Sequence, residues 1–477
     1  MEKLESNGHE ISMGNKVRFG EKIIGLTQSV CPVCLKSIPA ERIQEKDSVY
    51  LRKTCKEHGD FKTVIWRGQP NFLTWSKQKK PEKPIACQTA TEKGCPFDCG
   101  LCPNHKQQTC CTLLEVTQRC NLHCSVCFAD AGLSCLDRQE EVLVEDPTKE
   151  ELLSQLETVW NTIGKCNIQL SGGEPTLRND LPGIIRAARL MGYTFFQLNT
   201  NGIRLAEDPG FVRDLKEAGL STVFLQFDGV SDDVYERLRG QKLLAQKQKA
   251  IENCRIHRLG VVLVPTLVPG VNTDQIGDIV RFALQRMPVV RGVHFQPISY
   301  FGRYPVPPED KDRITLPEVM QSLEKQTNGL MKAANFTSSD CESAWCSFHG
   351  DFIYMEDGVL TPVTEKKDCC DKNGYLLNER SVTKNQSFVA NRWQILSESG
   401  CCTEDSTKVP DDFDRFLDRI KNYRISITCM TFQDAYNLDL ERLQYCCIPV
   451  LSGDKAIPFC AFNLTGRDGQ SLYRRNS

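Results

Sequence analysis

The sequence predicts an α/β fold centred on a parallel β-sheet, with a small metal-binding domain before it and a less regular region after it. Two observations carry this prediction. Between residues 113 and 302, six short runs of apolar and β-branched residues alternate with helical stretches, the pattern of strands joined by right-handed crossovers. The polar and glycine-rich motifs of this region directly follow the strand-like runs, at the strand ends where parallel sheets bind ligands.

The composition is that of a globular protein with one unusual feature, its cysteines. Lys and Arg (59) nearly balance Asp and Glu (61), so the net charge of −2 gives no electrostatic footprint for nucleic acid. No apolar run approaches the ~20 residues of a membrane span, and the polar start of the chain lacks a signal-peptide core, which predicts a cytoplasmic protein. In that compartment, 25 cysteines favour metal binding or catalysis over a disulfide framework.

Residues 1–80 carry the first cysteine group. The sequence CPVC at 31–34 and the later TCKEHG at 54–59 are typical of a small zinc or rubredoxin-like knuckle. We therefore expect one mononuclear zinc or iron ion with a structural role, because a tetrahedral metal site can hold so small a domain together. Its ligands would be Cys31, Cys34, Cys55 and either His58 or a later cysteine such as Cys87.

Residues 81–112 form a cysteine-rich connector. Its sequence GCPFDCGLCPNHKQQTCC contains a C-x3-C-x2-C pattern that is closely followed by two more cysteines. Because a fourth thiolate is at hand, we expect a fully ligated auxiliary [4Fe–4S] cluster, and a structural zinc ion is the alternative. The residues expected to bind it are Cys95, Cys99, Cys102 and Cys110, with Cys111 as the alternative to Cys110.

The central region, residues 113–302, holds the strand-like runs and the clearest helices. A helix is predicted within DPTKEELLSQLETVW, where Thr148 and Glu151 have capping-box spacing and apolar residues recur at intervals of three and four. The stretches LPGIIRAARLMG and FVRDLKEAG end in glycine, a common helix stop. In order, the predicted strands are CTLLEVT, CNIQLSG, TFFQLNTNG, STVFLQFDG, VVLVPTLV and GVHFQPIS.

A second C-x3-C-x2-C pattern, formed by Cys120, Cys124 and Cys127, follows the first of these strands. Three thiolates can hold three irons of a [4Fe–4S] cube, which leaves the fourth iron free to bind the amino and carboxylate groups of S-adenosylmethionine. One electron from the cluster can then cleave the sulfonium and release a 5′-deoxyadenosyl radical, which abstracts hydrogen from carbon. With SGGEP at the end of the next strand, this loop resembles the radical S-adenosylmethionine superfamily.

The ends of the following strands supply candidate contacts to that cofactor. The glycines of the GGEP motif would let the backbone approach the methionine amino group, with a charged glutamate nearby. The polar residues at the ends of the third and fourth strands are equally consistent with contacts to the cofactor and with hydrogen bonds to neighbouring protein groups. No catalytic residue is assigned. The candidate cofactor-binding residues are Gly172, Gly173, Glu174, Pro175, Asn199, Thr200, Gln226 and Asp228.

Residues 303–477 begin with a Pro-rich, charged segment and carry scattered cysteines. Three or four of these can converge on a further iron–sulfur cluster, and buried free cysteine is the alternative. The candidates are Cys346, Cys429, Cys446, Cys447 and Cys460. The residues left unassigned are Cys135, Cys166, Cys254, Cys341, Cys369, Cys370, Cys401 and Cys402.

Most of the chain resembles the archaeal tetraether lipid synthases and their bacterial relatives. The resemblance lies in CPVCLKSIPA, in GCPFDCGLCPNHKQQTC running into LLEVTQRCNLHCSVCFADAG, and in FQDAYNLDLERLQYCCIPV and IPFCAFNLTGRDGQSLYR. It implies a partial (β/α)6 barrel with an N-terminal metal knuckle and auxiliary clusters. By the same resemblance, Cys120, Cys124 and Cys127 hold the radical cluster. The cysteines that it implies for one auxiliary cluster are Cys95, Cys99, Cys102 and Cys110. Those that it implies for a second are Cys346, Cys446, Cys447 and Cys460. The segment 365–410 departs from the family.

Three functions follow from these patterns. The resemblance implies an enzyme that joins lipid tails through their terminal carbons, with a reducing donor such as ferredoxin or flavodoxin and peripheral contact with a membrane. The alternative is a radical methylase or maturase that acts on a pterin, another small molecule or a peptide. The third is a non-enzymatic electron-transfer or nucleic-acid-binding protein, which the neutral charge and the strand-end GGEP disfavour. A long apolar pocket would favour lipid, and a short polar pocket would favour pterin.

Overall fold

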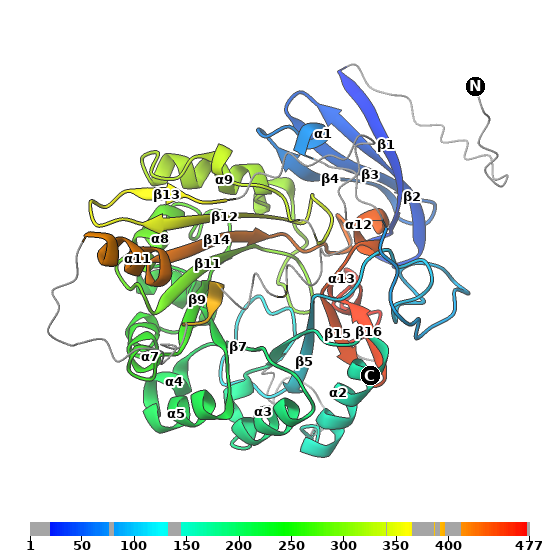
Figure 1. The fold of residues 1–477 in the computed structure, drawn as a ribbon. Coiled ribbons are helices and arrows are strands. Elements are labelled where there is room, and N and C mark those ends of the chain that lie inside the picture. The colour runs from blue at the N-terminus through cyan, green and yellow to red at the C-terminus, as the bar shows by residue number, and fades with distance from the viewer. Residues whose placement is uncertain are drawn as a thin grey trace, which may run out of the picture.

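The computed structural model describes residues 20–75, 81–131, 145–339, 341–364, 386, 392–395 and 412–474 of the chain. Within them, the strands form one sheet of four strands and one of twelve. Figure 1 shows the small sheet at one corner of the molecule, beside the carboxy-terminal helix α12 (Leu440–Gln444). The large sheet runs through the rest, with helices along its outer side.

The small sheet is the N-terminal domain, and its strands pair antiparallel in sequence order. Lys53 is buried where this sheet meets the carboxy-terminal segment, and its Nζ donates to Ser29 Oγ at 2.9 Å and to the Ala435 carbonyl at 2.7 Å. Arg42 Nε donates to Asp439 at 2.8 Å across the same contact. The elements of this domain are β1 (Glu21–Val30), β2 (Ser37–Glu45), β3 (Ser48–Cys55), β4 (Gly59–Arg67) and α1 (Phe72–Trp75).

Six parallel strands form the core of the large sheet, as the sequence predicts, and each lies beside the next in chain order. Together with the helices between them they make the partial (β/α)6 barrel. The strands are β5 (Cys111–Thr117), β6 (Asn167–Gly172), β7 (Phe196–Thr200), β8 (Thr222–Gln226), β9 (Gly260–Val264) and β11 (Val290–Pro297). The helices are α2 (Lys149–Thr162), α3 (Leu181–Leu190), α4 (Ile203–Glu207), α5 (Pro209–Ala218), α6 (Asp232–Arg239), α7 (Leu244–Ile256) and α8 (Ile276–Leu284).

The predicted helix signals are present in the structure. Thr148 Oγ accepts from the Glu151 amide at 3.2 Å, and the Glu151 carboxylate accepts from the Thr148 amide at 2.7 Å, which confirms the capping box. Helix α5 ends at Gly219, whose φ of 100° is left-handed and therefore suits glycine. The apolar face of α2 buries Leu152 and Leu156 against the sheet, and this face forms part of the main hydrophobic core.

The carboxy-terminal region extends the barrel sheet at both edges, which the sequence did not predict. At one edge β14 pairs parallel with β11, and two antiparallel strands follow it; at the other, β15 pairs parallel with β5 and antiparallel with β16. These strands are β12 (Ser347–Tyr354), β13 (Leu360–Pro362), β14 (Arg424–Met430), β15 (Pro449–Ser452) and β16 (Lys455–Pro458). The remaining elements are η1 (Pro175–Leu177), β10 (Thr266–Leu267), η2 (Asp310–Asp312), α9 (Leu316–Gln326), η3 (Ala333–Asn335), α11 (Asp412–Asn422) and α13 (Phe459–Phe462).

A membrane-spanning helix would need a long apolar stretch. Among the described residues, no helix is long and apolar enough to cross a bilayer.

Candidate functional site

The loop after β5 presents the three cysteines of the second C-x3-C-x2-C pattern to a cavity of about 390 Å³. Cys124 is only 8 % exposed, and Cys120 and Cys127 are half-buried. Cys127 exchanges two backbone hydrogen bonds of 3.0 Å with Arg303, which follows β11 in the chain. The Arg303 side chain also donates to the Cys124 carbonyl at 3.1 Å. The cluster loop is therefore anchored from the opposite side of the barrel.

The two glycines of GGEP are required by contact with the backbone that leads into this loop. A Cβ on Gly172, whose φ is 127°, would lie 2.1 Å from the Thr117 carbonyl oxygen. A Cβ on Gly173 would lie 2.2 Å from the carbonyl oxygen of Arg119. The Gly173 amide donates to the Thr117 carbonyl at 2.8 Å. The sequence explained these glycines by approach to the cofactor, and the structure adds the close approach of two backbone segments.

Glu174 joins the GGEP segment to the end of β7. Its side chain is buried, and Oε1 accepts from the Thr176 amide at 3.0 Å and from Thr200 Oγ at 2.7 Å. Oε2 accepts from the Asn201 amide at 2.7 Å. Because protein donors occupy both oxygens, Glu174 positions the strand ends, and Pro175 starts the short helix η1 that follows it.

Asp228, one of the predicted cofactor contacts, is not among the residues that line this cavity. Its carboxylate is fully buried and accepts from Arg239 Nε and Nη at 2.8 Å each, and from the Thr266 amide at 3.1 Å. Burial opposes the charge of Arg239, but the carboxylate of Asp228 raises the pKa of this guanidinium. Arg239 itself lines the cavity beside Cys124. Asp228 therefore acts by holding this arginine in place.

Most of the other candidate cofactor contacts border the cavity that the cluster loop faces. Asn199, Thr200 and Gln226 line the same cavity as the three cysteines. Within the part of the chain that the structure describes, the buried Oε1 of Gln226 has no hydrogen-bond partner. A buried acceptor without a partner is costly unless a ligand satisfies it. Gly172, Gly173 and Glu174 also border this space, whereas Pro175 does not.

Sequence reasoning missed three residues that hold this region together. Besides Arg239 and Arg303, these include Lys247, which is buried and donates from Nζ to the Asn201 carbonyl at 2.5 Å. Burial lowers the pKa of Lys247 to about 8. No short sequence motif reveals these residues, because their partners are distant in the chain. The partner of Lys247 is 46 residues away, and that of Arg303 is 179 residues away.

The N-terminal knuckle brings together four predicted ligands. The ligand atoms of Cys31, Cys34, Cys55 and His58 all lie within 4.8 Å of one another. His58 Nδ1 is 3.4 Å from Cys55 Sγ and 3.6 Å from Cys31 Sγ, while Cys87 is exposed and outside the group. Burial opposes ionisation, but backbone hydrogen bonds at Glu57 and the His58 side chain lower the pKa of Cys55 to about 6. Of the two alternatives for the fourth ligand, the geometry favours His58.

The connector motif does not meet Cys110. Cys95, Cys99 and Cys102 surround a small hollow that is also lined by His105 and Gln444. A hydrogen bond with Cys95 lowers the pKa of Cys102 to about 6, whereas burial and the charges of Cys102 and Cys446 raise the pKa of Cys99. The thiol that adjoins this motif is thus Cys446. The Sγ atoms of Cys110 and Cys341 are bonded to each other.

The carboxy-terminal cysteines that the resemblance implies as ligands of one cluster lie in two separate groups in the structure. Cys447 lies with Cys110 and Cys341, because the folded chain brings the segment before β15 against the connector. Cys446, Cys346 and Cys460 remain neighbours: burial and then the charges of Cys446 and Cys346 raise the pKa of Cys460. Cys111 and Cys429 line the cavity, and Cys166 and Cys254 are buried and free. The unassigned residues Cys135, Cys369, Cys370, Cys401 and Cys402 lie outside the described residues.

Comparison with known proteins identifies the two main parts of the chain. The model of the radical SAM superfamily matches residues 114–283, and the HMPTM N-terminal zinc ribbon domain matches residues 23–67. Over an alignment 486 positions long, the chain is 37 % identical to the 7,8-dihydro-6-hydroxymethylpterin dimethyltransferase of Methanocaldococcus jannaschii, covering 92 % of this chain and 94 % of that protein. The chain belongs to the radical SAM superfamily. Within the superfamily it belongs to the family of this dimethyltransferase.

Other radical SAM proteins match only part of the chain. The GTP 3′,8-cyclase of Listeria monocytogenes is 32 % identical over 194 residues, which are 40 % of this chain and 55 % of the cyclase. The solved structure of Streptococcus suis SuiB bound to precursor peptide SuiA has a TM-score of 0.38 at 15 % identity, covering 47 % of this chain and 46 % of that one. At this level, the structural likeness carries no argument about function.

Membership of the radical SAM superfamily implies a [4Fe–4S] cluster and S-adenosylmethionine, together with a reductant and a small-molecule substrate. The residues present fit these groups. Three thiols from one loop face a cavity, and Gln226, whose buried Oε1 has no hydrogen-bond partner among the described residues, lies on the same wall. Soft thiolates in a C-x3-C-x2-C pattern are the donors expected for a cluster with an open iron.

The predicted coupling of lipid tails is contradicted. A relative that matches almost the whole chain is a pterin dimethyltransferase, and the resemblance to tetraether lipid synthases is not supported beyond the superfamily. The cavity wall itself is mostly apolar, with amides and imidazoles among the side chains that line it. The amide and imidazole residues in its wall are Asn167, Gln169, Gln197, Asn199, Asn201, Gln226, His294, Gln296 and His349.

Replacing Cys34 by alanine should lower the melting temperature or the yield of folded protein, because a structural metal contributes its binding free energy to folding. Cleavage of S-adenosylmethionine by the folded fraction should stay near the wild-type rate, since the zinc ribbon lies outside the cavity wall. Thermal unfolding and 5′-deoxyadenosine formation measure the two effects. Loss of cleavage in well-folded protein would instead make the ribbon metal part of electron transfer.

Proposed function

We propose that this protein is a radical SAM methyltransferase whose substrate is a pterin, such as 7,8-dihydro-6-hydroxymethylpterin. The observation that carries the proposal is the 37 % identity to the M. jannaschii pterin dimethyltransferase over 92 % of this chain and 94 % of that protein. The agreement extends to the N-terminal zinc ribbon, whose family model is the HMPTM domain.

The cavity offers features that suit a flat heterocycle with a polar edge. Phe224 lies 4.8 Å from Trp393 and 5.6 Å from His294 between ring centroids, and all three line the cavity. Such rings provide faces on which a fused pterin ring can stack. Burial lowers the pKa of His294 to about 4, so its imidazole is neutral near pH 7, and its Nδ1 shares a 2.7 Å hydrogen bond with Thr428. This aromatic part of the wall favours a planar substrate.

Two buried polar atoms complement the edge of a pterin. Gln226 Oε1 accepts and Trp393 Nε1 donates, and among the described residues neither has a hydrogen-bond partner. A pterin carries an amino group that can donate to the first and a ring carbonyl or nitrogen that can accept from the second. Leaving such atoms unpaired costs about 1–3 kcal/mol each, so a substrate that satisfies them gains selectivity over one that does not.

The chain's own residues would prepare the reaction in three ways. Cys120, Cys124 and Cys127 would hold the cluster, which with S-adenosylmethionine supplies a hydrogen-abstracting 5′-deoxyadenosyl radical when bound. Arg303 and the GGEP backbone hold the loop at the cavity. The surrounding buried side chains exclude water, which protects a reactive carbon from side reactions.

The additional cysteines support further metal cofactors. Cys95, Cys99 and Cys102, with Cys446 as the adjoining thiol, would hold an auxiliary [4Fe–4S] cluster. A reducing protein such as ferredoxin or flavodoxin would supply electrons to the radical cluster. The ribbon ligands would hold one zinc ion.

Anaerobic protein incubated with S-adenosylmethionine, reductant and the pterin should form 5′-deoxyadenosine in a pterin-dependent reaction. If the pterin carries deuterium on its carbons, deuterium should appear in the 5′-deoxyadenosine, because the radical abstracts a carbon-bound hydrogen. With a small-molecule cell extract as methyl source, the pterin should gain one methylene unit of mass for each methyl group added. Mass spectrometry reads out both products.

The variant Trp393→Phe keeps the ring but removes the buried donor, so it should weaken pterin binding while pterin-independent cofactor cleavage persists. Leu190→Ala, at an exposed position on α3, is the control and should change neither. Cofactor cleavage that no pterin stimulates, with deuterium instead transferred from a peptide, would replace this proposal with the maturase alternative.

A further inference from the structure

A short segment of the chain, residues 392–395, lies against the amino ends of two barrel strands. A Cβ on Gly260, the first residue of β9, would lie 2.4 Å from the carbonyl oxygen of Trp393. Arg291, the second residue of β11, donates from Nε to the Arg392 carbonyl at 3.2 Å. Figure 1 shows this segment, in orange, beside β9. Because the cluster loop follows the carboxyl end of β5, the segment lies at the opposite end of the barrel, and we call it the floor segment.

The indole of Trp393 projects from the floor segment into the cavity. Trp393 is only 8 % exposed and lines the cavity, and its ring centroid lies 4.8 Å from that of Phe224 and 6.5 Å from that of His294. A Cβ on Gly292 would lie 3.5 Å from Trp393 Nε1, so β11 passes close to the indole. These contacts place the indole between strands β8 and β11, at the end of the cavity away from the cluster loop.

A buried ion pair holds the floor segment in place. Arg392 forms a salt bridge with one carboxylate oxygen of Asp351, whose side chain is only 1 % exposed. Ser426 Oγ donates to the other oxygen at 2.6 Å. Asp351 on β12 and Ser426 on β14 lie opposite each other in the sheet. Breaking such a pair leaves a buried charge without its partner, which is costly. The carboxy-terminal strands therefore fix the position of Trp393 in the barrel.

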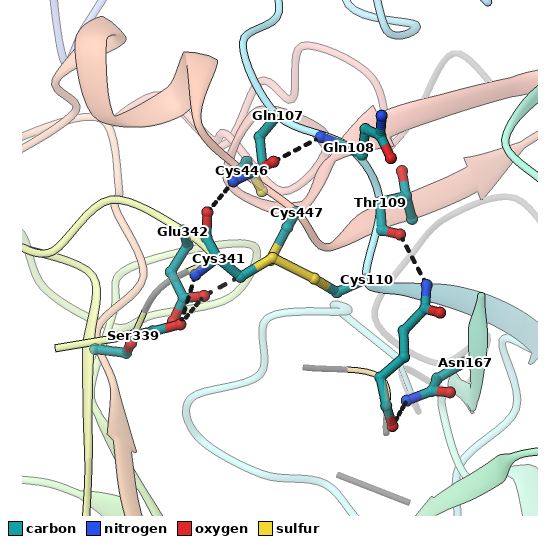
Figure 2. The surroundings of a disulfide bond; sticks show 12 residues. Gln107, Gln108, Thr109, Cys110, Asn167, Ser339, Cys341, Glu342, Cys446 and Cys447 are labelled. Carbon is teal, nitrogen blue, oxygen red and sulfur yellow. Dashed lines mark hydrogen bonds between the residues drawn. A yellow bond between two sulfur atoms is a disulfide. The ribbon is translucent and has the colours of Figure 1, made fainter. Parts of the chain in front are cut away.

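One side wall of the cavity is built from other segments, where the connector meets the carboxy-terminal region. Figure 2 shows Cys110 bonded to Cys341 beside Cys447 at this junction. Ile448 packs against this group and, like Cys110 and Cys447, lines the cavity. Because this wall and the floor segment come from different parts of the chain, side-chain bulk can be removed from either of them separately.

The place of the floor bears on the direction in which a pterin lies in the cavity, a step that rests on the function proposed above. The pyrimidine ring of a pterin carries the amino group and the carbonyl, and it has no carbon-bound hydrogen. Hydrogen abstraction takes place at a carbon, so the other ring, the pyrazine ring, has to face the cluster loop. The pyrimidine ring then faces the floor, where Trp393 Nε1 has no hydrogen-bond partner among the described residues.

We propose that Trp393 is a specificity-determining residue, whose indole forms the floor beneath the pyrimidine ring and excludes pterins that carry a bulky group on the exocyclic amino nitrogen. The bulk of the indole sets the depth of the cavity, and Nε1 donates to the pterin ring. Asp351 is a positioning residue. It is not among the residues that line the cavity, and it acts on the substrate only through Arg392 and the floor segment.

Binding of two pterins to the full-length protein under anaerobic conditions tests the proposal. The pterins are 7,8-dihydro-6-hydroxymethylpterin and its derivative with a benzyl group on the exocyclic amino nitrogen, and calorimetry measures both affinities. The wild type should bind the benzyl derivative at least about tenfold more weakly, because a well-packed wall does not yield to added bulk. Trp393→Ala should remove most of this difference. Trp393→Phe keeps a ring at the floor and should still exclude the benzyl derivative.

Two further variants separate the floor from general effects. Asp351→Asn keeps the shape of the side chain but removes the charge that holds Arg392, so it should reduce the difference between the two pterins. A residue with a merely structural role would alter both affinities alike. Ile448→Ala is the matched control, because it removes bulk from the side wall and should leave the preference unchanged. If the wild type binds the parent pterin and folded Trp393→Ala keeps the full preference, the proposal is overturned and the proposed function stands.

A second measurement does not depend on the substrate. Trp393→Ala removes an indole from a buried space beside Phe224 and Val262, and an apolar space of this kind can bind a small aromatic molecule. Free indole should therefore raise the melting temperature of Trp393→Ala and leave that of the wild type unchanged. Absence of this effect would show that Trp393 does not fill the floor. If the wild type does not bind the parent pterin, the proposed function fails, and the indole measurement still decides whether Trp393 forms the floor.

Discussion

Replacing Cys124 by alanine should reduce formation of 5′-deoxyadenosine from S-adenosylmethionine to the level of a reaction without enzyme. Cys124 is the most buried of the three thiols on the cluster loop, and its carbonyl is held by Arg303. Two thiolates can no longer hold three irons of the cube, so the iron that binds S-adenosylmethionine is lost with the cluster. The measurement is an anaerobic cleavage assay on reconstituted protein, with product separated by chromatography.

The matched control for this variant is Cys87→Ala. Cys87 is exposed and belongs to no group of ligands among the described residues, so cleavage should remain at the wild-type rate. The Cys124→Ala protein should also keep its remaining metal, because the other cysteine groups lie on other segments. Cleavage by Cys124→Ala at a rate near the wild type would remove Cys120, Cys124 and Cys127 from the radical site.

The variant Gly172→Ala should lose both stability and cofactor cleavage. Its Cβ would lie 2.1 Å from the Thr117 carbonyl oxygen, and the φ of 127° is one that alanine rarely adopts. The backbone cannot relieve this overlap without moving the chain that leads to Cys120. Strain of this kind costs on the order of 1–3 kcal/mol, and the steric overlap adds to it. Thermal unfolding and retention of cluster iron measure the two consequences.

Gly183→Ala provides the comparison. Gly183 lies within α3, and the nearest atom to a new Cβ there is Lys149 Nζ at 3.9 Å. Alanine in a helix interior gains up to about 1 kcal/mol over glycine, so this variant should be equally or more stable with unchanged cleavage. If Gly172→Ala were as stable as Gly183→Ala and retained as much iron, the contact between the GGEP backbone and the cluster loop would contribute neither to folding nor to holding the cluster.

The sequence alone determined those features whose information is local. The six parallel strands follow from short apolar runs with turn residues at their ends, and the α2 capping box from two residues three apart. The cysteines of the cluster loop could be found because one short loop carries all three. The zinc ribbon was predictable for a similar reason, since each half of its ligand set lies on one turn.

Interactions between distant segments depended on the tertiary structure. The sequence placed Asp228 at a strand end, but only the fold shows that its carboxylate accepts two hydrogen bonds from the buried Arg239. The lipid substrate implied by the resemblance was wrong, and it was the comparison with the pterin dimethyltransferase that overturned it.

The grouping of Cys110, Cys341 and Cys447 had no signal in the sequence. Spacing can reveal ligands on one loop, but these three come together because the carboxy-terminal strands add to both edges of the barrel sheet. β15 pairs with β5 and so brings Cys447 to the connector, while β14 and β12 extend the opposite edge. Strand pairing across more than two hundred residues is decided by the packing of the whole chain, and no local pattern encodes it.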